Sequence, residues 1–163
     1  MSGEELLDEA KKYSRNLLNF FWRQGVSISD GEDLLQETFL RLWKYRDRYV
    51  KTAKLSTFLF VIARQVRLDA LRGATRRAKR EEDFMAEAPD RAEPPSPCVR
   101  EDVRWAMSRL SEPMREVVEL GVFQDLPYAE IARIQGVPVG TVKSRMSNAL
   151  SKLKELFNER RSR

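Results

Sequence analysis

Histidine is absent from the 163-residue chain, and cysteine occurs once, at Cys98. Because histidine is the commonest general base and zinc ligand, its absence excludes a histidine-dependent catalytic triad and a histidine-based metal site. A single cysteine excludes an intramolecular disulfide and fits a reducing compartment. The sequence also lacks a glycine-rich phosphate loop, and no cluster of acidic residues in it points to a reaction. We therefore expect no enzyme activity and no bound cofactor or metal.

Long apolar runs are also missing. The longest one, residues 58–63, is far shorter than the roughly 20 residues that a membrane-spanning helix needs. The first ten residues contain Glu4, Glu5, Asp8 and Glu9, whereas a secretion signal begins with basic residues. We therefore expect a soluble, cytoplasmic protein that does not insert into membranes.

Charged residues, in contrast, are plentiful. The 30 Lys and Arg side chains outnumber the 25 Asp and Glu side chains, which gives a formal net charge of +5. A basic balance suits a polyanionic partner such as nucleic acid, although many soluble proteins are mildly basic. The position of the charges along the chain is therefore more informative than their sum.

Apolar residues recur at helical spacing in three N-terminal segments, and no segment alternates with the period of a strand. The first segment contains Leu6, Leu7, Ala10, Tyr13, Leu17, Leu18 and Phe21. The second begins near Asp30 and has an apolar face of Leu34, Leu35, Thr38, Phe39, Leu42 and Trp43. The third contains Leu55, Phe58, Leu59, Ile62, Ala63, Val66, Ala70 and Leu71. This pattern predicts an all-α fold.

A change in composition divides the chain. Basic residues gather between Arg72 and Arg80, and residues 87–97 contain four prolines, which disfavour helix and extend the backbone. Helical spacing resumes at Val99, and Ser111 is a suitable N-cap for a helix with Pro113 in its first turn. We predict an N-terminal helical bundle over residues 1–80, a Pro-rich linker over 81–98 and a second domain over 99–163.

The second domain contains the pattern of a helix-turn-helix. Pro127 fits a helix start, and Gly136 stands where that helix must end, because glycine adopts the left-handed conformation at little cost. The small side chain of Ala132 lets a second helix cross closely. That second helix begins near Val139 and is expected to bury Val142, Met146, Ala149, Leu150 and Leu153.

The other face of this second helix is suited to DNA. It carries side chains that bond to phosphates and base edges, namely Thr141, Lys143, Ser144, Arg145, Ser147, Asn148 and Lys152. No acidic residue occurs from Pro138 to Lys154, in a chain with 25 acidic residues. A solvated face of a structural hairpin is the alternative, but the missing acids favour a DNA-reading helix.

Several segments resemble a known family. Residues 33–43, DLLQETFLRLW, look like region 2.2 of bacterial sigma factors, and residues 55–69 resemble regions 2.3 and 2.4. Residues 110–118, 128–132 and 139–145 resemble region 4. Regions 1.1 and 3 have no counterpart, as in the extracytoplasmic-function class. The resemblance implies binding to core RNA polymerase (β′ and β subunits) and promoter DNA, with control by an anti-sigma factor.

The resemblance implies that the region 2.2 helix docks on the β′ subunit. Helical spacing places its polar residues together on the face opposite the core, around one exposed leucine. This expected docking set is Asp33, Gln36, Glu37, Leu40, Arg41 and Lys44. A plain solvated face is the alternative interpretation. Trp43 is expected in the core, so that its loss would unfold the domain.

The resemblance also implies that the third segment and the loop before it capture the unpaired −10 strand, with one base flipped into a pocket, and that region 4 reads the −35 element. The expected −10 residues are Lys54, Phe60, Arg64, Gln65 and Arg67. Phe60 fits a peripheral core position equally well. Gln65 replaces the asparagine of many relatives, and the loop from Val50 to Lys54 departs from the usual Arg-Gly-acidic stretch.

Two other functions fit parts of the pattern. A two-domain transcriptional regulator would use the N-terminal bundle to sense a signal or a partner. A helical adaptor, such as an anti-sigma antagonist, would bind protein and no DNA. An enzyme is the weakest alternative, and Cys98 is best interpreted as incidental, because only Arg100 lies near it to lower its pKa.

Overall fold

The computed structural model describes residues 2–49, 54–80 and 99–161, with the side chains of 74–80 and 99–100 excepted. These residues form helices and no strand, as expected for an all-α protein. The chain divides into two compact units, the first containing Met1–Phe21 and Val26–Glu93, the second Trp22–Gly25 and Pro94–Arg163. The predicted linker with Cys98 and most of the predicted −10 loop lie outside the described residues.

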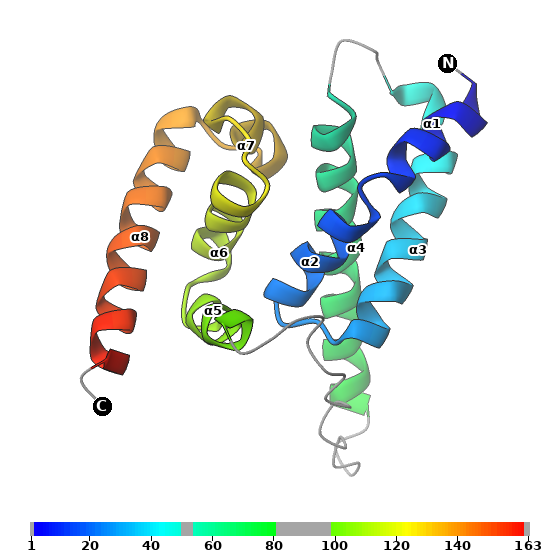
Figure 1. The fold of residues 1–163 in the computed structure, drawn as a ribbon. Coiled ribbons are helices and arrows are strands. Elements are labelled where there is room, and N and C mark those ends of the chain that lie inside the picture. Colours follow the sequence, from blue (N-terminus) through cyan, green and yellow to red (C-terminus); the bar gives the residue numbers. More distant parts are fainter. Residues whose placement is uncertain (1, 50–53, 81–98, 162–163) are drawn as a thin grey trace. The chain divides into compact units, whose positions relative to one another are not determined.

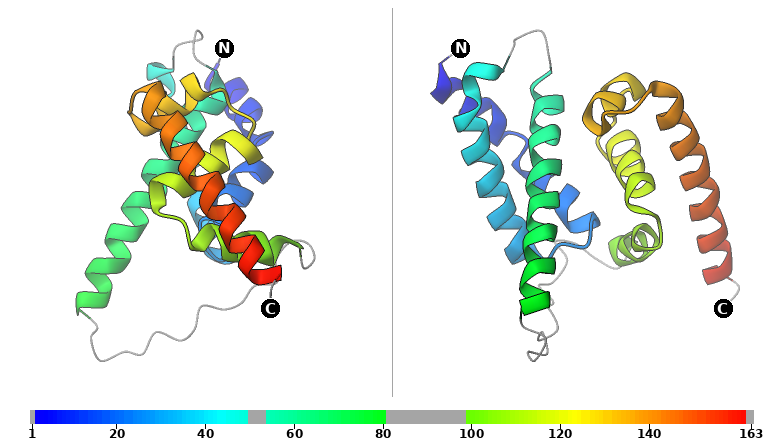
Figure 2. Two further views of the ribbon diagram at one scale, coloured as in Figure 1. Left: turned by 90° about the vertical axis from the view of Figure 1, so that its left-hand side faces the viewer. Right: turned by 180° about the vertical axis from the view of Figure 1, so that it is seen from behind.

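The first unit is built around an antiparallel pair of long helices (Figure 1). Its elements are α1 (Gly3–Lys11), α2 (Ser14–Arg23), α3 (Ile28–Lys44), the 3-10 turn η1 (Arg46–Arg48) and α4 (Leu55–Arg80). The pair consists of α3 and α4, and the two views in Figure 2 show α1 and α2 along one side of it. No described helix has both the length and the apolar character needed to cross a membrane.

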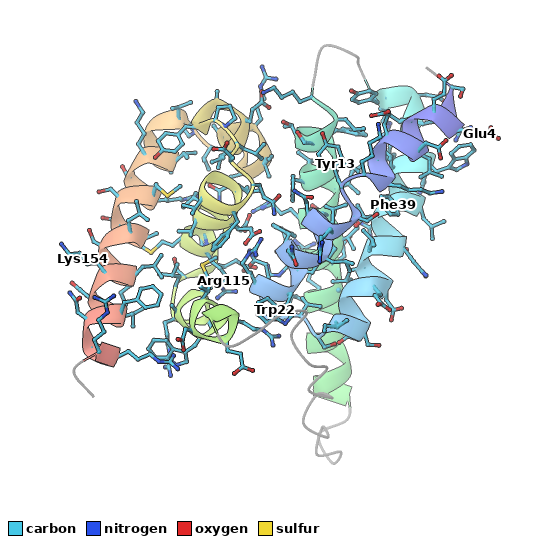
Figure 3. The ribbon with its side chains drawn as sticks, viewed as in Figure 1. Glu4, Tyr13, Trp22, Phe39, Arg115 and Lys154 are labelled. Atoms are coloured by element: carbon cyan, nitrogen blue, oxygen red, sulfur yellow. The ribbon has the colours of Figure 1, made fainter. Side chains whose placement is uncertain are left out.

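The core of this unit lies where α1, α3 and α4 meet. The buried members of this cluster are Leu6, Ala10, Leu42, Leu59, Ile62 and Val66. Phe39 and Tyr13, labelled in Figure 3, pack against it as partly buried side chains. Helical spacing predicted most of these positions, because each helix turns one apolar stripe toward the others.

Helix boundaries differ from the predictions at two places. The single helix expected from Leu6 to Phe21 is wrong, because the helix ends at Lys11 and the Ser14 hydroxyl donates a 2.7 Å hydrogen bond to the Lys11 carbonyl oxygen. Serine competes in this way for backbone groups that would otherwise continue a helix. α3 begins slightly before Asp30, because Ser27 caps it by accepting a 3.1 Å bond from the Asp30 amide.

The second unit contains α5 (Val99–Ser108), α6 (Glu112–Val118), the π-helical turn η2 (Glu119–Phe123), α7 (Tyr128–Gln135) and α8 (Val139–Arg161). α6 and α7 both pack against α8. Ser111 occupies the N-cap position of α6 with Pro113 in the first turn, which confirms that prediction. Arg115, labelled in Figure 3, donates 3.0 and 3.1 Å hydrogen bonds to the carbonyl oxygens of Met107 and Leu110, which completes the end of α5.

Candidate protein-binding and nucleic-acid interfaces

The outward face of α3 is polar, as the sequence predicts. Asp33, Gln36, Leu40 and Lys44 are exposed, whereas Glu37 and Arg41 are partly buried. Leu40 is 65% exposed, so this leucine packs against little of the protein itself. We call the face formed by the following residues the docking face: Asp33, Gln36, Glu37, Leu40, Arg41 and Lys44.

Part of the docking face surrounds an open hollow of about 450 Å³. Four residues of the docking face line this hollow, namely Glu37, Leu40, Arg41 and Lys44. Tyr45 and one residue of the neighbouring helix α4, Asp69, complete the lining. An apolar side chain surrounded by both signs of charge is the usual composition of a polar protein–protein contact. The hollow therefore joins the docking face to α4.

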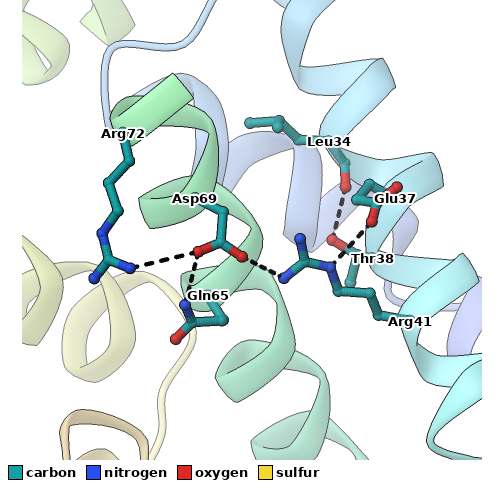
Figure 4. A network of polar contacts seen from close by, with 7 residues as sticks. All are labelled: Leu34, Glu37, Thr38, Arg41, Gln65, Asp69 and Arg72. Atoms are coloured by element: carbon teal, nitrogen blue, oxygen red, sulfur yellow. Dashed lines mark hydrogen bonds and ion pairs between the residues drawn. The ribbon is translucent and has the colours of Figure 1, made fainter. Parts of the chain in front are cut away.

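A carboxylate of α4 holds this junction together, as Figure 4 shows. Arg41 Nη1 donates a 2.8 Å hydrogen bond to Asp69 Oδ2, and Arg41 Nε donates a 3.0 Å bond to Glu37 Oε1. Gln65 Nε2 donates a 2.9 Å bond to Asp69 Oδ1, and Arg72 Nη1 lies 3.8 Å from the same oxygen. We call these residues the Asp69 cluster: Glu37, Arg41, Gln65, Asp69 and Arg72.

Hydrogen bonds and charge within the Asp69 cluster favour the ionised forms of Asp69 and Arg41. The hydrogen bond from Arg41 lowers the pKa of Asp69, the bond from Gln65 and the charge of Arg72 act in the same direction, and partial burial opposes them. Burial lowers the pKa of Arg41, but the hydrogen bonds to Asp69 and Glu37 outweigh it and leave that pKa raised. The ion pair is therefore complete at neutral pH.

The predicted −10 residues, which are Lys54 just before α4 and four residues within it, divide into two groups by exposure. Gln65 and Lys54 are exposed and Arg64 is partly buried, whereas Phe60 is 2% exposed and Arg67 is 6% exposed. The expectation that Arg67 points outward is therefore wrong, and of the two positions that the sequence leaves open for Phe60, the structure has the core one. The Phe60 ring meets the Phe20 ring of α2 edge to face, with centroids 5.5 Å apart. Because α4 is covered by α2 as well as by α3, its buried face is wider than the single stripe that the sequence predicts.

Trp43 also differs from its prediction as a core residue, because it is 42% exposed. It lies near the end of α3 and close to the start of α1: a Cβ atom on Gly3 would be 2.8 Å from the Trp43 ring. The guanidinium of Arg46 lies 4.4 Å from the ring centroid, in a cation–π arrangement. Trp43 thus packs at the edge of the first unit.

The helix-turn-helix is present at the predicted place. α7 ends at Gly136, whose φ of 67° is the left-handed conformation that glycine adopts without a steric cost. Val142, Met146 and Ala149 of α8 are buried as expected, but Leu150 is 48% exposed, which corrects the prediction for that residue. Leu156 is buried instead, further along α8.

The predicted DNA-binding residues lie on the free side of α8. Lys143, Ser144, Ser147, Asn148 and Lys152 are exposed, and Thr141 and Arg145 are partly buried. We call these seven residues the α8 face. Since residues 138–154 contain no acid, this face presents only hydroxyl, amide and cationic groups. Such groups bond to phosphates and to base edges.

Two residues outside the predicted set hold the predicted ones in place. Asp69 joins Arg41 to Gln65, and Gln135 accepts a 3.0 Å hydrogen bond from Arg145 Nη1 while its amide donates a 3.2 Å bond to the Pro113 carbonyl oxygen. Of these contacts, sequence spacing predicts only the one between Gln65 and Asp69, because Asp69 follows Gln65 by one helical turn. The link to Arg41, 28 residues away, requires the tertiary fold.

Comparison with known proteins identifies both units. Residues 10–77 match the Sigma-70 region 2 family, and residues 100–153 match the family Sigma-70, region 4. The chain is 31% identical over 150 residues to the ECF RNA polymerase sigma factor RpoE of Cereibacter sphaeroides, an alignment that covers 88% of this chain and 81% of that protein. It is also 31% identical to the ECF RNA polymerase sigma factor SigG of Mycobacterium tuberculosis, covering 93% of this chain and half the length of that relative.

A solved structure supports the same assignment. The sigma factor RpoE in complex with the anti-sigma factor NepR, from Bartonella quintana, superposes with a TM-score of 0.79 at 25% identity, covering 93% of this chain and 97% of that one. Sequence and fold therefore agree over both units. This chain belongs to the extracytoplasmic-function sigma factors of the sigma-70 family.

Proposed function

We propose that this protein directs promoter-specific initiation of transcription by bacterial RNA polymerase. In this proposal the docking face of α3 binds the β′ subunit, the exposed residues of α4 contact the unpaired −10 strand, and the α8 face binds the −35 element. One observation carries the proposal: a single chain contains a polar docking face with an exposed leucine and an acid-free face on a helix-turn-helix. A DNA-binding regulator needs only the second.

The set of −10 residues is narrower than the sequence alone predicts. Lys54, Arg64 and Gln65 have exposed or partly exposed side chains from which they could meet single-stranded DNA. Phe60 and Arg67 are buried, so we assign them to the core. Stacking of bases on aromatic rings, which Phe60 would have supplied, forms no part of this proposal.

Run-off transcription tests the proposal. Core RNA polymerase is combined with the full chain and a template library randomised in the two promoter elements, and transcripts are sequenced. A sigma factor yields transcripts from a defined subset of templates. A regulator yields specific transcripts only after another sigma factor is added, and an adaptor yields none, so either result contradicts the proposal.

Disruption of the docking face provides a second measurement. Leu40→Glu places a charge where we propose contact with β′, on a side chain exposed enough for the fold to accept it. We expect loss of core binding in a fluorescence competition assay and an unchanged unfolding midpoint. Leu71→Glu, at an exposed leucine of α4, is the matched control and should bind core polymerase as wild type does.

We further propose control by an anti-sigma factor. The supporting observation is the likeness to RpoE, which was solved in complex with the anti-sigma factor NepR. An inhibitor of this kind should compete with core polymerase for the docking face. Recovery of a bound protein that core polymerase does not displace would contradict such competition.

A further inference from the structure

One carboxylate in the first unit connects two side chains to which the proposed function gives different tasks. Asp69 accepts a hydrogen bond from Arg41, a member of the docking face, and another from Gln65, a proposed −10 residue (Figure 4). Each bond uses a different oxygen of the carboxylate, at 2.8 and 2.9 Å. The position of the Gln65 amide is thus fixed by a residue that need not touch DNA.

The chemistry of the pair determines which way the amide faces. An ionised carboxylate only accepts hydrogen bonds, so Gln65 must turn its NH₂ group toward Asp69. Its carbonyl oxygen then lies on the far side of the amide, away from Asp69, and Figure 4 shows it there. Because Gln65 is exposed, this oxygen is accessible to a ligand outside the cluster.

We propose that Asp69 is a positioning residue that makes Gln65 present a hydrogen-bond acceptor to one unpaired base of the −10 element. An acceptor bonds to the exocyclic amino group of adenine, cytosine or guanine, whereas thymine has no amino group and offers only its ring N3–H, between two carbonyl oxygens; we therefore expect the amino-bearing bases to be favoured. The inference rests on the proposed function, because it requires α4 to meet promoter DNA. Beyond the proposed function, the inference names Asp69 as the residue that sets the preference of Gln65 for particular bases.

Substitutions between carboxylate and amide at Asp69 and Gln65 test this role, because they exchange hydrogen-bond donors and acceptors with little change in side-chain shape. In Asp69→Asn, the remaining carbonyl oxygen pairs with the Arg41 cation, and the new NH₂ group faces Gln65. The Gln65 amide must then turn over, so that it presents its NH₂ group outward. This group bonds to ring nitrogens or carbonyl oxygens, which every base has, so the preference for amino-bearing bases is lost. In the double variant Asp69→Asn, Gln65→Glu, the carboxylate introduced in place of the Gln65 amide accepts from the new asparagine and presents an oxygen outward again.

The experiment uses the full chain with core polymerase and a template library randomised across the −10 element. For wild type we expect the amino-bearing bases to exceed thymine at one position by about tenfold, as for one good base contact. Asp69→Asn should remove that preference, and the double variant should restore it. Asp47→Asn, an exposed charge in η1 outside the cluster, should leave it unchanged.

The outcomes separate this inference from the function on which it rests. Wild-type base preferences in Asp69→Asn, with normal core binding, would overturn the inference and leave the proposed function standing. No promoter-specific transcript from wild type would overturn both. If Asp69→Asn fails to bind core polymerase, Gln65→Ala is tested instead. The inference requires this variant to lose the base preference at the same promoter position, and an unchanged preference overturns the inference.

Discussion

Arg145 is held in place within the α8 face by its own unit. Its guanidinium donates to Gln135, whose amide is in turn fixed by the Pro113 carbonyl oxygen. A side chain ordered in the free protein loses less conformational entropy when it binds, so its contacts yield more affinity. Lys143, in contrast, is exposed on the same helix. Of the two cations, Arg145 is thus the one whose position a hydrogen bond fixes before DNA binds.

Removal of either cation should weaken promoter binding. We expect Arg145→Ala and Lys143→Ala each to cost about 1–3 kcal/mol if the lost contact is to a base edge. Titration of the holoenzyme with labelled promoter DNA measures the change. Arg161→Ala, which removes an equal charge near the end of α8, is the control and should have a small effect. Normal binding by both variants would contradict the assignment of the α8 face.

The Asp69 ion pair predicts a specific pH dependence of stability. Because Arg41 lowers the pKa of Asp69 below its ordinary value of 3.8, the ionised carboxylate stabilises the folded state. This contribution is complete above the unfolded-state pKa of about 4 and is lost as the pH falls through the lower folded-state pKa. The difference in unfolding free energy between wild type and Asp69→Asn, from urea titrations, should therefore be constant near neutrality and shrink below about pH 4. A difference that grows in acid would contradict the pairing.

Trp43 should tolerate replacement better than a core residue. Since 42% of its surface stays exposed, Trp43→Ala should cost about 1–2 kcal/mol, below the roughly 3–5 kcal/mol typical of a buried aromatic ring. Urea unfolding followed by circular dichroism measures this. Leu42→Ala, at the fully buried neighbouring position, is the comparison and should cost more. Equal losses would restore the interpretation of Trp43 as a core residue.

At the scale of the helix, spacing predicts the buried face of α3, which packs against α1 and α4, better than that of α4. On α3 it correctly separates the buried Thr38 and Leu42 from the exposed Leu40. On α4 it fails at Phe60 and Arg67, because a second helix covers the side that a single stripe leaves open. Spacing also does not detect the break after Lys11, where the Ser14 hydroxyl donates to the Lys11 carbonyl oxygen. The order of the helices was thus predictable from the sequence, whereas the contact of α2 with α4 was not.

The turn between α7 and α8 should depend on its glycine. Because Gly136 has a φ of 67°, a side chain there is strained, and Gly136→Ala should lower stability by about 1 kcal/mol. Gly136→Asn should cost less, since asparagine tolerates this conformation. Thermal unfolding of the full chain gives the loss, and hydrogen exchange at the amides of α7 and α8 locates it. Equal behaviour of the two variants would show that φ is not the cause.

At the scale of the whole molecule, excess positive charge predicts binding to DNA that falls steeply with salt. With a net charge of +5, the chain should bind nonspecific duplex with a log–log slope of about −0.9 for each phosphate contacted. Lys152→Gln on the α8 face should reduce the magnitude of the slope by about 1. Lys12→Gln is the matched control, because Lys12 already pairs with Glu9 at 2.8 Å. Fluorescence anisotropy across a salt series measures both, and equal slopes would argue against the α8 face.

The division of α8 into two faces has a consequence for how such a protein can diverge. Val142, Met146 and Ala149 hold the helix to its unit, while Lys143, Ser144, Ser147 and Asn148 point away from it. Substitutions on the outer side replace exposed side chains and leave the buried ones in place, so they should have a small folding penalty. Under the proposed function, a copy of the protein that arises by gene duplication could therefore come to recognise a different promoter through a few substitutions on the outer side of α8, while the buried residues of that helix stay constant. A library restricted to those four outer positions would be an efficient starting point for orthogonal gene circuits.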